Sequence, residues 1–139
     1  MLKKRLWSCA IALGWAISST SCASAPPVRM LASPDIPAAQ GTITATSAEN
    51  NNTAVVVDVR HLASPERVQP GATTYVVWAR AMGRDSYQNL GALRVDSDLR
   101  GRLRTVTPLR SFDVIVTAEA SPTVTAPANK GVLSATIER

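Results

Sequence analysis

The sequence predicts an all-β protein, a seven-stranded antiparallel sandwich of two sheets that follows an export leader and a proline-rich tether. Three observations predict this class. The apolar residues of the 139-residue chain are mainly alanine and valine, with only 4 % aromatic residues. Short runs rich in β-branched residues recur between turn-forming residues, and apolar and polar residues alternate within these runs. Strands at this spacing are typical of antiparallel β-sandwiches.

Residues 41–139 carry these runs and are long enough to form one domain with a buried core. Breaks rich in Gly, Pro, Asn, Asp and Ser separate the runs, as expected for turns. The predicted strands are residues 41–47, 53–61, 73–81, 88–95, 101–107, 111–119 and 131–138.

Alternation within the strands predicts which side chains form the core. Val55, Val57 and Val59 share one face of their strand, and Asp58 and Arg60 lie on the other. The same reasoning assigns to the core Tyr75, Val77, Ala79, Leu93, Val95, Phe112, Val114, Val116, Leu133, Ala135 and Ile137. The side chains expected to face water are Arg80, Arg94, Asp113, Thr117, Glu119, Ser134 and Glu138.

The first 22 residues have the layout of a secretory signal peptide. Residues 1–5 contain three basic side chains, residues 6–17 are an apolar segment, and small polar residues follow from position 18. The apolar segment is shorter than the roughly 20 residues needed to span a bilayer. We therefore expect export, with an uncleaved N-terminal anchor as the alternative.

Cys22 decides between two kinds of leader. Bacterial lipoproteins are processed at a cysteine that follows small residues, which fits Ser21 and Thr20, although an aliphatic residue is usual where Ser19 stands. Lipidation at Cys22 would place the protein in the outer membrane or periplasm. Ordinary cleavage after Ala23 would instead release a soluble secreted protein.

Charge and cysteine content exclude two classes of protein. The formal net charge is +5, but Lys3, Lys4 and Arg5 belong to the leader, and their removal leaves 12 basic against 10 acidic residues. This excess is too small to indicate a nucleic-acid-binding protein. Cys9 lies inside the leader, so the processed chain has too few cysteines for an internal disulfide or a thiolate metal site, and we expect no cofactor and no metal.

Residues 23–40 predict a tether between the leader and the domain. Pro26, Pro27, Pro34 and Pro37 favour extended polyproline-like backbone that pairs with no other strand. At about 3.1 Å per residue such a tether would span roughly 55 Å. A plain disordered arm has the same composition and is the alternative.

Trp78 and four arginines are the candidate partner contacts. Trp78 lies on the face opposite Tyr75, where it is either covered by a loop or exposed for binding. Alternating arginines form a basic stripe that fits an anionic glycan or a lipid headgroup, or else a solvated or acid-paired face that discourages aggregation at a sheet edge. The stripe consists of Arg100, Arg102 and Arg104, joined across a hairpin by Arg94.

No pattern in the sequence predicts catalysis. His61 is the only histidine, and although Asp58 and Ser64 lie near it in sequence, residues three apart in a strand point to opposite faces. There is no G-x-S-x-G motif for a nucleophile. We expect His61 to be a solvated or hydrogen-bonded residue at a strand end.

Two further motifs are better explained by turns than by ligands. Asp96 and Asp98, with Asp85, could offer oxygens to calcium, but they fall far short of an EF-hand pattern. Asn51 begins a glycosylation triplet, which in a chain with a bacterial leader is more simply a turn.

Three segments resemble the extracytoplasmic C-terminal domain of anti-sigma-K factors. They are TYVVWAR at 74–80, NLGALRVDSDLRGRLRT at 89–105 and SFDVIVTAEASPTVTAPANKGVLSATIE at 111–138. The resemblance implies an Ig-like domain outside the cytoplasm. The sigma-binding and transmembrane parts of that family have no counterpart here, so sigma-factor binding is not implied.

Together these features predict a non-enzymatic, exported envelope protein, a lipoprotein that presents an Ig-like binding or interaction domain. Its expected partners are another envelope protein, an anionic glycan or a lipid headgroup. The alternatives are a structural envelope lipoprotein without a dedicated ligand site and, more remotely, a small secreted hydrolase.

Overall fold

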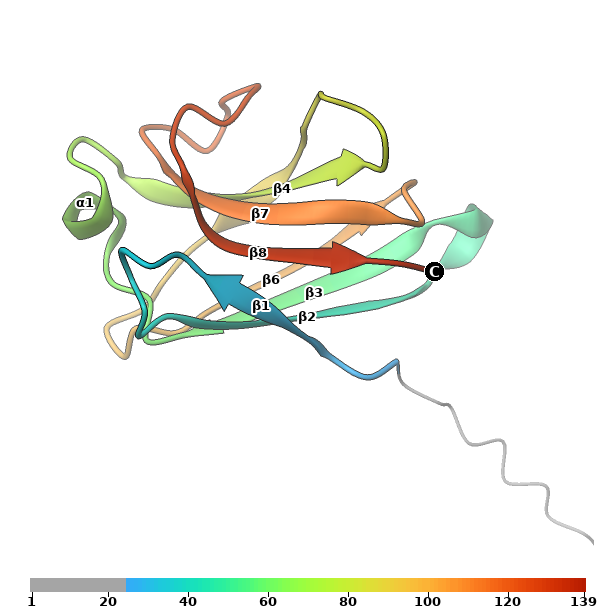
Figure 1. Cartoon of the computed structure of the whole chain (residues 1–139), viewed down its shortest axis with the longest axis horizontal. Helices are drawn as coiled ribbons and strands as arrows, with labels where there is room; N and C mark the ends of the chain where they lie inside the picture. Colours follow the sequence, from blue (N-terminus) through green and yellow to red (C-terminus); the bar gives the residue numbers. More distant parts are fainter. Residues whose placement is uncertain (1–24) are drawn as a thin grey trace, which may run out of the picture.

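The computed structural model describes residues 25–139, whose regular secondary structure is almost entirely β-strand (Figure 1). The all-β prediction is confirmed, with eight strands rather than seven. The leader, Cys22 and both expected cleavage points lie outside the described residues. The elements are β1 (Val28–Ala32), β2 (Gln40–Ser47), the 3-10 turn η1 (Glu49–Asn51), β3 (Thr53–Arg60), α1 (Pro65–Val68), β4 (Thr74–Ala81), β5 (Gln88–Leu93), β6 (Gly101–Thr107), β7 (Phe112–Glu119) and β8 (Gly131–Ile137).

All eight strands belong to one antiparallel sheet in the order β5-β4-β7-β8-β1-β2-β3-β6. The sheet curls until its two edge strands approach each other, so that β4 and β7 pass over β3 and β2 (Figure 1). An isolated bridge joins Val95 to Gly101. The hydroxyl of Thr107 in β6 donates to the side-chain carbonyl of Gln88 in β5 at 3.3 Å. The sheet is therefore nearly closed, which differs from the expected division into two separate sheets.

The eighth strand, β1, lies in the segment that was expected to be a tether. Its five residues contain no proline, so each can take part in strand pairing. β1 pairs with β2 through Val28 to Met30 and with β8 through Leu31 and Ala32, and so joins the two halves of the sheet. Met30 is 4 % exposed and belongs to the core. The polyproline-like expectation is therefore wrong for residues 28–32.

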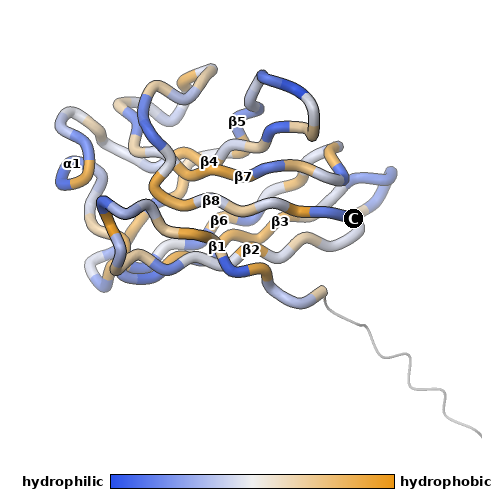
Figure 2. The backbone as a smooth tube through the Cα atoms, viewed as in Figure 1, coloured by the Kyte–Doolittle hydropathy of each residue, from blue (hydrophilic) through white to orange (hydrophobic). Residues whose placement is uncertain are grey.

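The core lies inside the curled sheet and follows the predicted alternation. Every predicted core residue is buried except Val95 and Ala135, which are partly buried. Polar residues concentrate in the connections between strands (Figure 2). Tyr75 reaches from the core to the main chain, where its hydroxyl donates to the carbonyl oxygen of Ala63 at 2.7 Å. Burial raises the pKa of Tyr75 to about 12.

Candidate functional site: an arginine face

The outward side of β1, β2, β3 and β6 carries a group of arginines that the strand register brings together. Arg29 pairs with Thr42, Thr42 with Asp58, and Asp58 with Arg102, so these four residues form one row across four strands. Gln40 pairs with Arg60 on one side of the row, and Val56 pairs with Arg104 on the other. We call the surface defined by Arg29, Arg60, Arg102 and Arg104 the arginine face.

These side chains point outward because their neighbours in sequence point into the core. Met30, Val57 and Val59 are buried, and Leu103 packs against the core. Since successive residues of a strand face opposite sides, the arginines between them must face water. The basic face is thus a direct consequence of the same alternation that builds the core.

A shallow depression of about 490 Å³ lies on the arginine face. Its surroundings combine three guanidinium groups with one carboxylate and with uncharged donors and acceptors. Guanidinium groups offer planar pairs of donors, which match the oxygens of carboxylates and phosphates. The lining residues are Arg29, Gln40, Gly41, Thr42, Asp58, Arg60 and Arg102.

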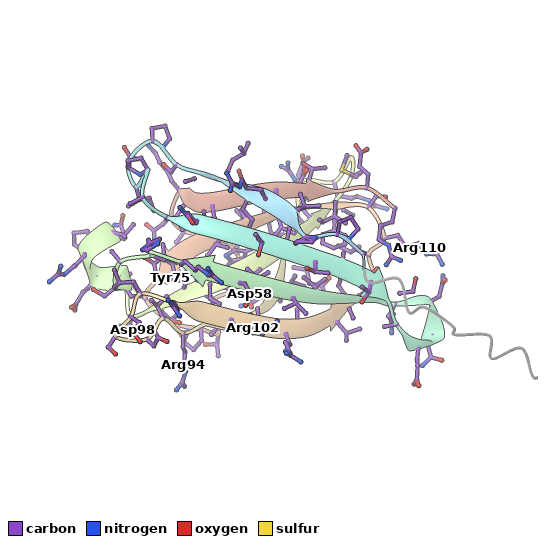
Figure 3. The ribbon with its side chains drawn as sticks, turned by 90° about the horizontal axis from the view of Figure 1, so that it is seen from below. Asp58, Tyr75, Arg94, Asp98, Arg102 and Arg110 are labelled. Carbon is purple, nitrogen blue, oxygen red and sulfur yellow. The ribbon has the colours of Figure 1, made fainter. Side chains whose placement is uncertain are left out.

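Within residues 25–139, only one arginine of this face has an acidic partner. Arg102 Nε lies 3.2 Å from Asp58 Oδ1, and both side chains are about half exposed. Such surface pairs contribute little to stability, typically about 0–1 kcal/mol. Arg102 and Asp58 lie on the same side of the sheet (Figure 3). The face as a whole therefore keeps an excess of positive charge.

The predicted stripe is found in part on this face. Arg102 and Arg104 lie outward on β6, as expected, whereas Arg100 lies in the turn before the strand. Arg94 is exposed just beyond the end of β5, and the bridge between Val95 and Gly101 places it beside the start of β6. Figure 3 shows Arg94 on the same side as Arg102.

Sequence reasoning missed two members of the arginine face, Arg29 and Arg60. Arg29 lay in the segment assigned to the tether, and Arg60 was counted only as a solvent-facing residue at the end of a strand. These two arginines lie near Arg102 only because of the register of β1 with β2 and of β3 with β6. Alternation within a strand shows which side a residue faces, but it does not show which strands pair or in what register.

Trp78 lies on the outward side of β4, on the opposite side of the domain from the arginine face, and is 0 % exposed. Its indole N–H donates to the hydroxyl oxygen of Thr117 at 2.8 Å. The Thr117 hydroxyl in turn donates to Glu119 Oε1 at 2.6 Å, and the backbone N–H of Ala128 donates to the same oxygen at 3.1 Å. Trp78 is therefore covered rather than exposed for binding. In this conformation its ring cannot contact a partner.

Residues 120–130 form the loop that covers Trp78. Asn89 in β5 donates to the carbonyl oxygens of Pro122 and Val124 at 3.0 and 2.9 Å. At the other end, Asn129 donates to the carbonyl oxygen of Ala118 at 2.7 Å. This cover buries Thr117 and Glu119. The expectation that these two side chains face water is therefore wrong, because alternation identifies the side of the sheet and not what lies over it.

The charges on this opposite side are largely paired. Arg80 lies 2.9 Å from Asp113, and the hydroxyl of Thr136 donates to the other carboxylate oxygen of Asp113 at 2.7 Å. These two hydrogen bonds hold the pKa of Asp113 below its usual value, and the bond to Asp113 raises the pKa of Arg80. The Arg80 guanidinium also stacks over Tyr87, 5.1 Å from the ring centroid.

The remaining candidate residues are accounted for by turns. His61 is exposed and has φ of 54°, at the point where the chain turns after β3. Asp96 Oδ1 accepts the backbone N–H groups of Asp98 and Arg100 and so stabilises the turn before β6. Asn51 also lies in a turn, with φ of 65°. Within residues 25–139 no three His, Cys, Asp or Glu side chains are grouped closely enough to hold a metal ion.

Comparison with known proteins leaves the family open, since neither the protein-family models nor the curated proteins include a match to this chain. The resemblance to the outer domain of anti-sigma-K factors remains a prediction. No helix in the described part of the chain, residues 25–139, is both long and apolar enough to cross a membrane.

Proposed function

We propose that this chain is a non-enzymatic, exported protein of the bacterial envelope, anchored by a lipid on Cys22, that presents an Ig-like β domain as a binding module. The leader and the position of Cys22 support export and anchoring. The resemblance of residues 74–138 to an extracytoplasmic domain supports the same location and the Ig-like class.

The arginine face is the observation that carries a binding role. It combines a shallow depression with guanidinium groups on three of four consecutive strands of the sheet, Arg29 on β1, Arg60 on β3 and Arg102 on β6. This arrangement suits a ligand that has several negative charges spaced along it, such as an acidic glycan or a layer of lipid headgroups. An envelope protein with an acidic surface would meet the same donors.

Burial of Trp78 favours a second candidate, a structural envelope lipoprotein with no dedicated ligand. Exposed aromatic residues often anchor protein partners, and here the loop over Trp78 removes the most obvious anchor. Under this alternative the arginines keep the surface soluble and prevent aggregation at the sheet edge.

The anchoring part of the proposal is tested by mass spectrometry of the full chain expressed with its leader. A diacylglyceryl group on Cys22 is the expected result. A mature chain that begins with an unmodified Ser24 would make the protein soluble and secreted.

The binding part is tested with immobilised polygalacturonate, an acidic glycan, and with vesicles that contain phosphatidylglycerol. We expect binding to at least one of them, and weaker binding when Arg29 and Arg60 are both replaced by alanine. The matched control replaces Arg67 on α1 and Arg84 in the β4–β5 connection, two exposed arginines away from the face. Equal binding by both double variants, or no binding to either probe, would favour the structural alternative.

A further inference from the structure

We propose that the arginine face lies against the anionic headgroups of the same membrane that holds the lipid on Cys22. This inference rests on the proposed lipid anchor and goes beyond it by naming the occupant of the face and the orientation of the domain. Two observations carry the inference, the short distance along the chain between Cys22 and β1 and the uneven distribution of charge over the sheet.

The tether is much shorter than its composition suggests. Because β1 begins at Val28, only residues 23–27 separate it from Cys22. In a polyproline-like conformation these residues span about 16 Å. A domain of this size has a radius of gyration of about 13 Å and is thus roughly 30 Å wide. A tether this short keeps the nearest surface of the domain within about 16 Å of the headgroups, so that little movement brings that surface into contact with them.

The arginine face is the surface closest to the anchor along the chain. Arg29 is the second residue of β1 and follows Cys22 by only seven positions, at most about 25 Å of extended chain. From Arg29 the row continues through Thr42 and Asp58 to Arg102 on adjacent strands. Neighbouring strands are about 4.8 Å apart, so the row is about 14 Å long. All of it can rest on the bilayer at once.

The charge distribution selects this face over the opposite one. The outward positions of β1, β2, β3 and β6 hold four arginines and one aspartate, Asp58. On the outward side of β4, β7 and β8, Arg80 is paired with Asp113, and Glu119 is buried under the loop. Electrostatic attraction is screened within about 8 Å at physiological ionic strength, so only charges held at the surface contribute. Anionic lipid therefore attracts the arginine face and not the outward side of β4, β7 and β8.

One exposed apolar side chain accompanies the arginines. Val106 on β6 is 54 % exposed and shares the outward side with Arg104. A side chain of this kind contacts the boundary between headgroups and acyl chains. It is too small to drive deep insertion, so the arginines dominate the interaction.

The test measures binding of the full chain carrying Cys22→Ser to two kinds of vesicle, so that the face is assayed without its anchor. One kind is phosphatidylcholine alone, and in the other one third of the lipid is phosphatidylglycerol. We expect binding only to the anionic vesicles and its loss at high salt. Each arginine near an anionic surface changes affinity about five-fold, so Arg29→Glu combined with Arg104→Glu weakens binding by about 25-fold or more. Arg104 is chosen over Arg102 because reversing Arg102 would also place a second carboxylate beside Asp58.

The control variant combines Arg67→Glu with Arg84→Glu, which changes the net charge equally and leaves the face intact. Equal weakening in both double variants would overturn the inference, since it would show that only net charge matters. Binding to polygalacturonate but to neither kind of vesicle would also overturn it, while leaving the proposed binding module in place. Binding to no probe, or a mature chain without lipid on Cys22, would instead show that the proposed function itself has failed. Circular dichroism of each variant checks that the sheet is intact.

Discussion

Thr117→Val should destabilise the domain, because Thr117 links a buried indole to a buried carboxyl group. Its hydroxyl oxygen accepts the N–H of Trp78 at 2.8 Å, and its hydroxyl proton goes to Glu119 Oε1 at 2.6 Å. Valine has nearly the same shape as threonine and suits a strand, so the substitution removes these two hydrogen bonds and little else.

The expected loss of stability follows from the hydrogen-bonding groups that Thr117→Val leaves without a partner. The Trp78 N–H is fully buried and, within residues 25–139, donates to Thr117 alone, and an unsatisfied buried donor costs about 1–3 kcal/mol. Loss of the bond to Glu119 adds about 1 kcal/mol. We therefore expect the free energy of unfolding to fall by about 3 kcal/mol. For a domain of this size the urea midpoint then falls by about 1.5 M.

Urea unfolding followed by Trp78 fluorescence is a suitable assay, because Trp78 is the only tryptophan outside the leader. Thr44→Val is the matched control, since Thr44 lies half-exposed on the outward side of β2. A second comparison introduces Thr117→Val into a Trp78→Phe background, followed by circular dichroism, where the substitution should cost at least 1 kcal/mol less. If Thr117→Val costs no more than Thr44→Val, or costs the same in both backgrounds, the proposed role of the network is wrong.

Three other predictions concern separate parts of the sheet. Asp113→Asn should lower the free energy of unfolding at neutral pH, and this loss should shrink as the pH falls below about 4, the usual pKa of aspartate, because a depressed pKa stabilises the folded state only while Asp113 is ionised and Arg80 can pair with it. Urea unfolding at neutral pH and at a series of lower pH values checks this, and a loss that does not change with pH would count against the ion pair. Gly101→Ala should lower the free energy of unfolding by about 1–3 kcal/mol, since a Cβ there would lie 2.6 Å from the carbonyl oxygen of Arg94, where β5 approaches β6. An unchanged midpoint of thermal unfolding would show that the sheet edges do not meet as described. The Tyr75 phenolate should be absent at pH 10 and form only near pH 12. Because folding raises the pKa of Tyr75, the free energy of unfolding should fall as the pH rises between about 10 and 12. Ultraviolet titration of the wild type against Tyr75→Phe measures the ionisation, and ionisation at pH 10 would contradict burial of the hydroxyl.

Local pattern in the sequence was enough to predict seven of the eight strands and most of the core. Val55, Val57 and Val59 alternate with polar residues, and such a strand can bury only one of its sides. The predicted strand 101–107 matches β6, and 41–47, 53–61 and 111–119 differ from β2, β3 and β7 by one residue. Positions of this kind are specified by their immediate neighbours in sequence.

Features that depend on distant parts of the chain could not be predicted. β1 was missed because prolines surround a five-residue segment whose only buried side chain is Met30. Glu119 was expected to be exposed because nothing in the sequence of residues 120–130 indicates that this loop folds over β7. The arginine face was seen only as a stripe on one strand, since Arg29 and Arg60 join it through strand pairing.

Site-specific labelling on a bilayer tests the arginine face most directly as the membrane-contacting surface. The lipidated chain is given one new cysteine, either Thr44→Cys on the face or Ser86→Cys in the β4–β5 connection, and each is labelled with an environment-sensitive fluorophore. On vesicles containing phosphatidylglycerol we expect a lipid-borne quencher to reduce the signal of the label at position 44 and to leave that at position 86 unchanged. Equal quenching at the two positions, or stronger quenching at position 86, would contradict this orientation.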